Sequence, residues 1–145
     1  MARIKVDLKG FSDMVEQIEA AGGDVARATD SCMRQCAQIM HAELKAEMKS
    51  TGVDDGLTNR MPQPEIEVNG NRYTSKVGYK MGNYNPDDPS DGYKAAFWNF
   101  GTPNRTKHGK VAPHGYIARA KKTAAPKIKK TQKQTLEKIL GRVSK

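Results

Sequence analysis

The sequence lacks several features that mark common classes of protein. Its 145 residues include only two Cys, three His and one Trp, and aromatic residues make up 6%. No stretch approaches the roughly 20 apolar residues that a membrane-spanning helix needs, and the segment from Met1 to Asp7 has no apolar signal-peptide core. We therefore expect no membrane contact. We expect a protein that stays in the cytoplasm or leaves the cell only within a larger assembly.

The residues that could perform chemistry are few and scattered. Cys32 and Cys36 lie four residues apart on an expected helix, and we interpret them as reduced core thiols because no further metal ligands accompany them. His41 belongs to the same helix, whereas His108 and His114 lie in a basic loop without a nearby acid or Cys. The sequence therefore predicts no catalytic residue, no metal site and no cofactor, and hence a protein that is not an enzyme.

Two patterns resemble ligand-binding loops but are incomplete. Asp87, Asp88 and Asp91 lack the spacing and the bidentate acid of a calcium loop, so they are expected in a solvated turn. Gly52 and Gly56 are not followed by the Lys and Ser or Thr of a phosphate-binding loop. Zinc-finger spacing, a leucine zipper and an aromatic RNA-binding signature are missing as well.

Positive charge is concentrated towards the C-terminus. Residues 105–145 contain 13 Lys and Arg against one acid, a net charge of +12, whereas residues 1–104 have a net charge of −3. Because these positive charges repel one another, they favour an anionic neighbour such as nucleic acid or an acidic protein surface. The residues that could contact phosphates without reading bases are Arg105, Lys107, Lys110, Arg119, Lys121, Lys122, Lys127, Lys129 and Lys130.

Periodicity predicts the elements of the first half of the chain. Residues 4–8 alternate as a short strand, and residues 11–21 have the apolar spacing of a helix that ends at Gly22 and Gly23. A longer helix follows over residues 25–49, because its apolar and sulfur-containing side chains keep to one stripe. Residues 50–64 are expected to form a loop.

The second half alternates between short elements and polar loops. Residues 65–68 and 72–79 form a predicted hairpin around Asn69 and Gly70, and residues 81–92 form a predicted loop. The C-terminal helix begins near Tyr116, and Pro126 either kinks it or begins a second helix. These elements predict a single α+β domain over residues 1–145. Its small antiparallel sheet packs against the long helix and a basic C-terminal helix, with residues 105–145 as the basic loop and C-terminal helical segment.

The densest aromatic cluster in the chain lies at residues 95–102. We expect at least two of Phe97, Trp98 and Phe100 to be largely buried and to form the main fixed point of the core. Whether residues 93–100 are a strand or a helical turn cannot be decided from periodicity. Gly101 precedes Thr102 and Pro103, so we expect a positive φ or a close backbone approach there.

The same segment carries a family resemblance. Phe-Trp-Asn-Phe-Gly-Thr, followed by Ala-Pro-x-x-Tyr-Ile-x-x-Ala, resembles the gene-product-ten-like tail components of long-tailed bacteriophages. Their pattern is an aromatic segment ending in acidic-aromatic-Gly-Thr, a loop, and Pro-Phe-Leu-x-x-Ala opening a C-terminal helix. Here Asn99 occupies the acidic position, and the Pro-Phe-Leu element is spread over residues 113–117. The matching residues are Phe97, Trp98, Phe100, Gly101, Thr102, Pro113 and Ala120.

The resemblance implies a structure and a function. It implies a short helix at residues 93–100 that runs into a strand-like end. It also implies a structural virion protein, a tail-completion or head–tail joining component of the neck or connector. Such proteins form homo-oligomeric rings, usually six-fold, around the DNA channel, after synthesis in the cytoplasm of the bacterial host. The implied partners are other head–tail or tail proteins, with non-specific contact to channel DNA. The rival hypothesis is a sequence-independent nucleic-acid-binding protein that uses the basic C-terminal segment directly.

Overall fold

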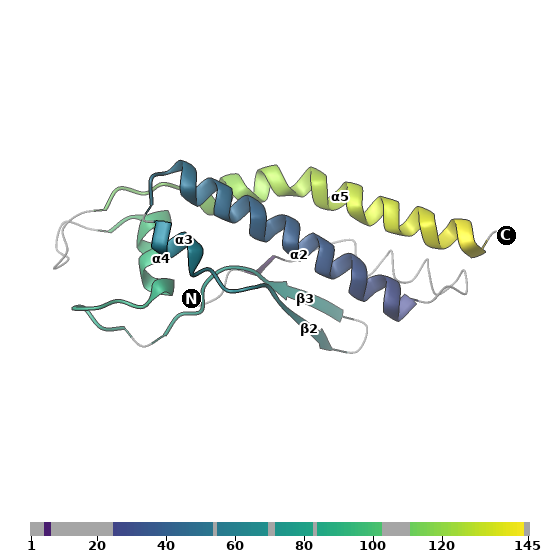
Figure 1. The fold of residues 1–145 in the computed structure, drawn as a ribbon, viewed down its shortest axis with the longest axis horizontal. Coiled ribbons are helices and arrows are strands. Elements are labelled where there is room, and N and C mark those ends of the chain that lie inside the picture. The colour runs from purple at the N-terminus through teal and green to yellow at the C-terminus, as the bar shows by residue number, and fades with distance from the viewer. Residues whose placement is uncertain are drawn as a thin grey trace.

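Two long helices and a small antiparallel sheet make up an elongated α+β fold (Figure 1). The computed structural model describes residues 5–6, 25–53, 55–69, 72–82, 84–102 and 111–143. The expected fold class is confirmed. The helix predicted over residues 11–21, and Arg105, Lys107, Lys110 and His108, lie outside the described residues.

Helix α2, Val25–Ser50, is the central element, and it confirms the predicted helix over residues 25–49 almost to the residue. Its buried side chains include Cys32, Met33, Met40 and Leu44, each almost fully removed from solvent. They recur at three- and four-residue intervals, so they fall on one face of the helix. The stripe of side chains seen in the sequence therefore forms the central part of the hydrophobic core.

Helix α5, Tyr116–Val143, packs antiparallel along α2 (Figure 1). Its buried face contains Tyr116, Ala120, Ala124 and Ile128, in steps of four residues. Small Ala side chains let the two helix backbones approach closely. Pro126 is exposed on the opposite side, and the helix continues through it. The structure thus has one long helix that contains Pro126, and Pro126 does not begin a second helix.

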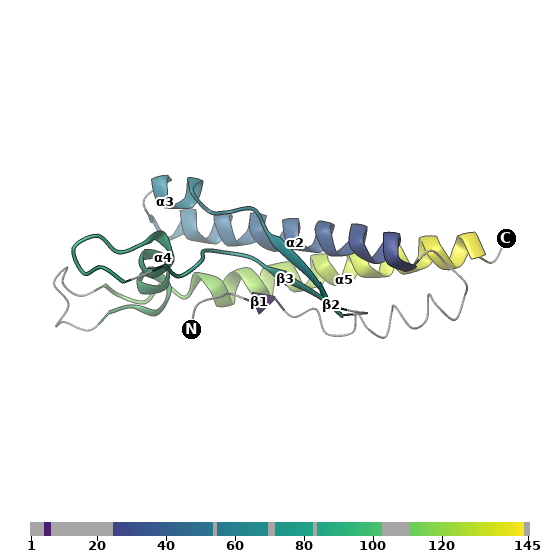
Figure 2. The same ribbon diagram turned by 90° about the horizontal axis from the view of Figure 1, so that it is seen from below.

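The sheet covers part of the same core (Figure 2). Its strands β1 (Lys5–Val6), β2 (Glu65–Asn69) and β3 (Arg72–Lys76) lie in the order β1-β3-β2, and both pairs are antiparallel. Ile66 lies opposite Ser75 and Val68 opposite Tyr73, as the predicted hairpin requires. Strand β3 contacts α2 and places Ser75 in the interior, with Val77 and Tyr79 buried just after it.

Two short helices differ from the sequence-based expectations. Helix α3, Asp55–Asn59, lies within the segment expected to be a loop, and it forms there because it can bury Leu57. Helix α4, Asp91–Phe100, takes up the whole aromatic segment. The expected strand-like end is wrong, because helical hydrogen bonding continues until the Gly101 N–H donates to the Phe97 carbonyl oxygen at 2.8 Å.

Gly101 ends α4 in a conformation that only glycine adopts easily. Its φ of 79° and ψ of 172° confirm the expected positive φ. A Cβ atom at this position would lie 2.9 Å from the Val111 carbonyl oxygen and 3.0 Å from the Pro113 ring. The expected close backbone approach is therefore also confirmed, and it is made with the segment that leads into α5.

Candidate functional site

The two segments that carry the resemblance contact each other where α4 ends and α5 begins. We call the contact between residues 95–102 and residues 111–117 the motif clamp. The His114 N–H donates to the Trp98 carbonyl oxygen at 3.1 Å, and the Gly115 N–H donates to the Asn99 carbonyl oxygen at 3.1 Å. The C-terminal carbonyls of α4 are thus satisfied by the segment that starts the next helix.

Asn99 gives the clamp its direct link to α5. Its side chain is buried, and its Oδ1 accepts the Ile117 N–H at 2.9 Å. The first N–H groups of a helix lack partners within the helix, so this amide satisfies one of them from a separate element. The position where the family pattern has an acid is therefore an acceptor that caps α5.

The Trp98 ring joins three elements. It stacks on the His114 ring with centroids 4.1 Å apart and planes 5° from parallel. Its Nε1–H donates to Thr51 Oγ1 at 2.5 Å, and the Thr51 hydroxyl donates to the Met48 carbonyl oxygen at 2.6 Å. Trp98 therefore connects α4 to the segment that precedes α5 and to the end of α2.

Two further contacts complete the clamp. The Tyr116 hydroxyl donates to the Ala95 carbonyl oxygen at 2.8 Å, and burial raises the pKa of this phenol above its ordinary value. Thr102 and Val111 bond in both directions. The Thr102 N–H donates to the Val111 carbonyl oxygen at 2.9 Å, and the Val111 N–H donates to Thr102 Oγ1 at 2.8 Å. Thr102 thereby binds directly to Val111, the next residue that the structure describes.

The motif residues have different roles from those expected of a core cluster. Phe100 is 66% exposed and Phe97 and Trp98 are only partly buried, so the three rings are not the main fixed point of the core that the sequence predicted. The reason is that α4 turns Ala95 and Asn99 inward instead of its aromatic side chains. Ala120 is fully buried, whereas Pro113 is exposed beside Gly101.

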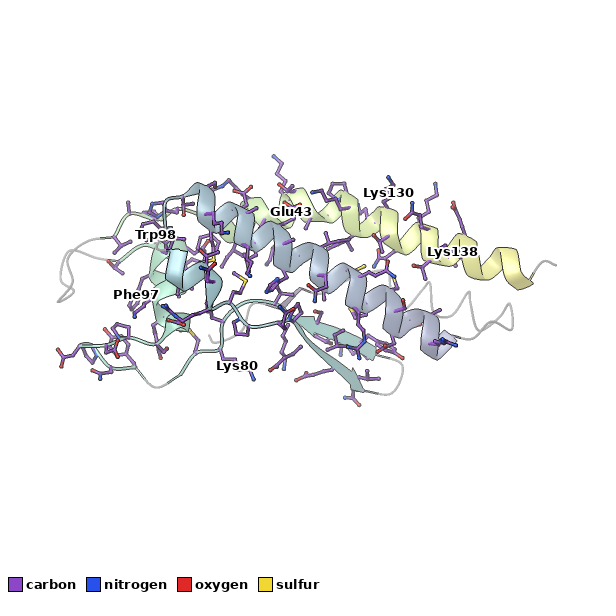
Figure 3. All side chains as sticks on the ribbon, viewed as in Figure 1. Glu43, Lys80, Phe97, Trp98, Lys130 and Lys138 are labelled. Carbon is purple, nitrogen blue, oxygen red and sulfur yellow. The ribbon has the colours of Figure 1, made fainter. Side chains whose placement is uncertain are left out.

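Two of the candidate phosphate-binding residues are engaged within the chain. Arg119 Nε donates to Glu47 Oε2 at 3.0 Å, and Lys127 forms an ion pair with Glu43. Both acids lie on α2, where Figure 3 labels Glu43, so these pairs join α2 to α5. Arg119 and Lys127 are therefore better interpreted as parts of the helix–helix contact than as free phosphate ligands.

Four other candidates remain on the surface of α5. Their side chains are exposed, and among the described residues no acid lies within ion-pairing distance of them: Lys121, Lys122, Lys129 and Lys130. Lys133 is exposed one turn beyond Lys129. Together they make a basic face on α5, which Figure 3 shows at Lys130 pointing away from α2. Such a face can attract phosphates by charge alone.

Other ionisable side chains are buried in the interior of the molecule. Burial, helped by the nearby positive charge of Lys45, lowers the pKa of His41, whose Nε2 lies 3.0 Å from the Pro62 carbonyl oxygen. The thiols of Cys32 and Cys36 are both buried, and a hydrogen bond between them together with burial raises the pKa of Cys36.

In the part of the chain that the structure describes, no cluster of three potential metal ligands occurs. Within the same residues, no helix has the length and apolar character to span a bilayer.

Comparison with known proteins gives no relative. No family model, no curated protein and no solved structure matches this chain. The fold and the site thus describe a small α+β protein with a motif clamp at one end and a basic face along its last helix.

Proposed function

We propose that this chain is a structural virion protein of a tailed bacteriophage, a tail-completion or head–tail joining component that forms a ring around the DNA channel. The observation that supports it most is the motif clamp. The two short segments that resemble the phage family flank residues 103–111, and they meet through Trp98, Asn99 and His114 around the start of α5.

The distribution of charge supports the same proposal. In a ring, repetition of the basic face of α5 would concentrate positive potential where channel DNA passes. Lys121, Lys122, Lys129 and Lys130 are the residues available for this role, since Arg119 and Lys127 are paired with α2. Lysine contacts would hold phosphates without reading sequence, as a channel that passes a whole genome requires.

The location in the virion can be tested by gold-labelled antibodies against the full chain, applied to phage particles that carry this sequence. We expect label at the head–tail junction or at the adjoining tail end. Label elsewhere on the particle, or a chain present in the lysate and missing from purified particles, would contradict the proposal.

The second candidate function is free sequence-independent nucleic-acid binding, and the exposed basic face of α5 favours it. The test is duplex DNA binding by the purified chain at several salt concentrations. Replacing Lys121 and Lys122 with Gln should flatten the slope of log affinity against log salt by about two, one for each lost phosphate contact. The matched control removes two exposed charges from other elements, Lys49→Gln with Arg72→Gln, and should leave the slope nearly unchanged.

The two functions differ in what these variants do in a phage. For a virion component, particles should assemble with the Lys121→Gln/Lys122→Gln chain and lose DNA retention. For a free nucleic-acid-binding protein, the chain should bind DNA tightly at physiological salt in the absence of any virion protein. Equal slopes for the two double variants would contradict a phosphate-binding role for Lys121 and Lys122.

A further inference from the structure

The outer face of α4 carries aromatic side chains that the rest of the described chain leaves partly uncovered. Tyr93 and Phe97, four residues apart on α4, have ring centroids 6.1 Å apart. Tyr84 packs on both from the preceding loop, at 5.0 Å and 6.3 Å, and is itself 50% exposed. Phe100, one turn further along, is 66% exposed. We call Tyr84, Tyr93, Phe97 and Phe100 the aromatic end.

Acidic residues border the aromatic end. Residues 84–92 contain Asp87, Asp88 and Asp91 and no Lys or Arg. Asp91 is used within the chain, because Arg60 binds both of its oxygens at 2.9 and 3.1 Å and lowers the pKa of that carboxyl group. Asp88 forms an ion pair with Lys94 at 3.7 Å, but its side chain is still 86% exposed and open to a further cation. The surface therefore combines apolar rings with negative charge.

A lysine-rich helix face is the chemical complement of such a surface. The aliphatic stem of a lysine packs on aromatic rings, and its ammonium group is attracted both to the ring faces and to a neighbouring carboxylate. This chain has such a face in the second half of α5, where Lys129, Lys130 and Lys133 are all exposed. The complement of the aromatic end is thus present in the same molecule.

The two surfaces cannot meet within one copy. Figure 3 places Phe97 at one end of the molecule and Lys130 well along α5 towards the other, and α4 and the end of α5 lie at opposite ends in Figures 1 and 2. An interaction between them must join two copies. Because the two surfaces differ, the contact is heterologous, and its repetition either closes a ring or extends a filament.

We infer that the aromatic end of one copy docks on the lysine face of a second copy, at Lys129, Lys130 and Lys133, in a head-to-tail contact. This inference deepens the proposed function, because it assigns the subunit contact of the ring. It also divides the basic face, with the second half of α5 contacting protein and Lys121 and Lys122, in its first half, left for DNA.

The apolar part of the contact is tested by sedimentation velocity of the full chain over a range of concentrations. Phe100→Ser removes an exposed ring and should weaken self-association by about tenfold or more, as expected of an aromatic anchor at an interface. Val68 is the matched control, because it is an exposed apolar residue, at 56%, on strand β2. Val68→Ser should leave self-association unchanged. Equal thermal unfolding of the two variants and the parent would show that the fold is preserved.

The charged part is tested by reversal on each side of the contact. Asp88→Lys alone, and Lys130→Asp with Lys133→Asp, should each weaken self-association by about three- to fivefold. Mixing the two variant chains restores opposite charges at both of the contacts that a mixed pair can make, because two reversed surfaces meet in one contact and two unchanged surfaces meet in the other. The mixture should therefore associate more tightly than either variant alone. Association of the parent chain should weaken as salt rises.

Three results would overturn the inference. They are a parent chain that stays monomeric at every concentration, a Phe100→Ser variant that associates like the parent, and charge reversals that show no recovery on mixing. These results are independent of the virion test. Self-association through this contact with no label on phage particles would refute the proposed function and leave the contact standing. Label at the neck together with a monomeric parent chain would support the proposed function and refute the subunit contact.

Discussion

The helix pair α2–α5 and the motif clamp are held together by different kinds of contact. The helix pair buries Met, Cys, Leu and Ala side chains in a continuous apolar stripe, with ion pairs only at its edge. The motif clamp depends on single directional contacts, each made by one side chain or one backbone group: Trp98 with Thr51, Asn99 with Ile117, and Thr102 with Val111. An apolar stripe tolerates exchange of similar side chains, whereas removal of a hydrogen-bonding group from the clamp leaves its partner unsatisfied.

The largest effect is expected at Gly101. Gly101→Val forces a branched side chain into a backbone conformation that costs non-glycine residues about 1–3 kcal/mol. It also brings Cβ against the Val111 carbonyl oxygen at 2.9 Å. We expect a total loss of about 3 kcal/mol or more in the free energy of unfolding, measured by urea denaturation. A variant as stable as the parent would show that the clamp tolerates substitution as well as the helix pair does.

Trp98→Ala should be the next most damaging change. It removes the stack on His114 and the hydrogen bond to Thr51, and leaves the Thr51 hydroxyl without that donor. Because Trp98 is only partly buried, we expect a loss of about 2–3 kcal/mol, at the low end of large aromatic truncations. Trp98→Phe keeps a ring on His114 and should lose about 1 kcal/mol, mainly for the hydrogen bond. Equal losses for the two variants would assign the whole effect to the indole N–H.

Asn99 tests whether capping links the clamp to α5. Asn99→Ala removes the acceptor of the Ile117 N–H and should lower stability by about 1–2 kcal/mol, with a loss of helical circular dichroism near the transition. Asn99→Asp supplies an acceptor again and adds a negative charge at a helix N-terminus, which the helix dipole favours. Asp at this position should therefore be much less damaging than Ala. The reverse order would contradict a capping role.

The smallest effect is expected in the helix pair. Met40 is almost fully buried in the stripe of α2. Met40→Leu keeps its apolar character and nearly its volume, so the loss should stay below about 1.5 kcal/mol. Met40→Gln, similar in length and polar, is the matched control and should lose more, since its amide would be buried without assured partners. If Met40→Leu proves as damaging as Trp98→Ala, the proposed contrast between the two regions is wrong.

Local patterns predicted the long elements well. The spacing of Cys32, Met33, Met40 and Leu44 predicts α2 and its buried face, and Asn69-Gly70 predicts the hairpin between β2 and β3. The conformation of Gly101 was predictable for the same reason, since a turn after an aromatic helix and before Thr-Pro limits the backbone to few conformations.

The contacts between distant residues were not predictable in this way. Composition indicates that Phe97 and Phe100 are apolar, and it says nothing about which face of α4 lies inward. The pairing of Glu43 with Lys127 joins residues 84 apart, and the pairing of Glu47 with Arg119 joins residues 72 apart. Their partners follow from the register of two helices, which no local spacing encodes. A count of basic residues therefore overstated the number available for phosphates.

The antiparallel packing of α5 on α2 has a consequence for synthesis of the chain. A ribosome releases α2 well before residues 116–128, which supply the buried face of α5. Until then, the Met and Cys side chains of α2 that α5 will cover stay exposed on the nascent chain. The side chain that caps α5 is already present by that time, because Asn99 precedes the helix it caps. Folding can therefore finish quickly once α5 emerges. A chaperone that shields apolar helices during the delay should bind α2 on nascent chains whose residues 116–128 are still inside the ribosome, and it should release α2 once those residues have emerged.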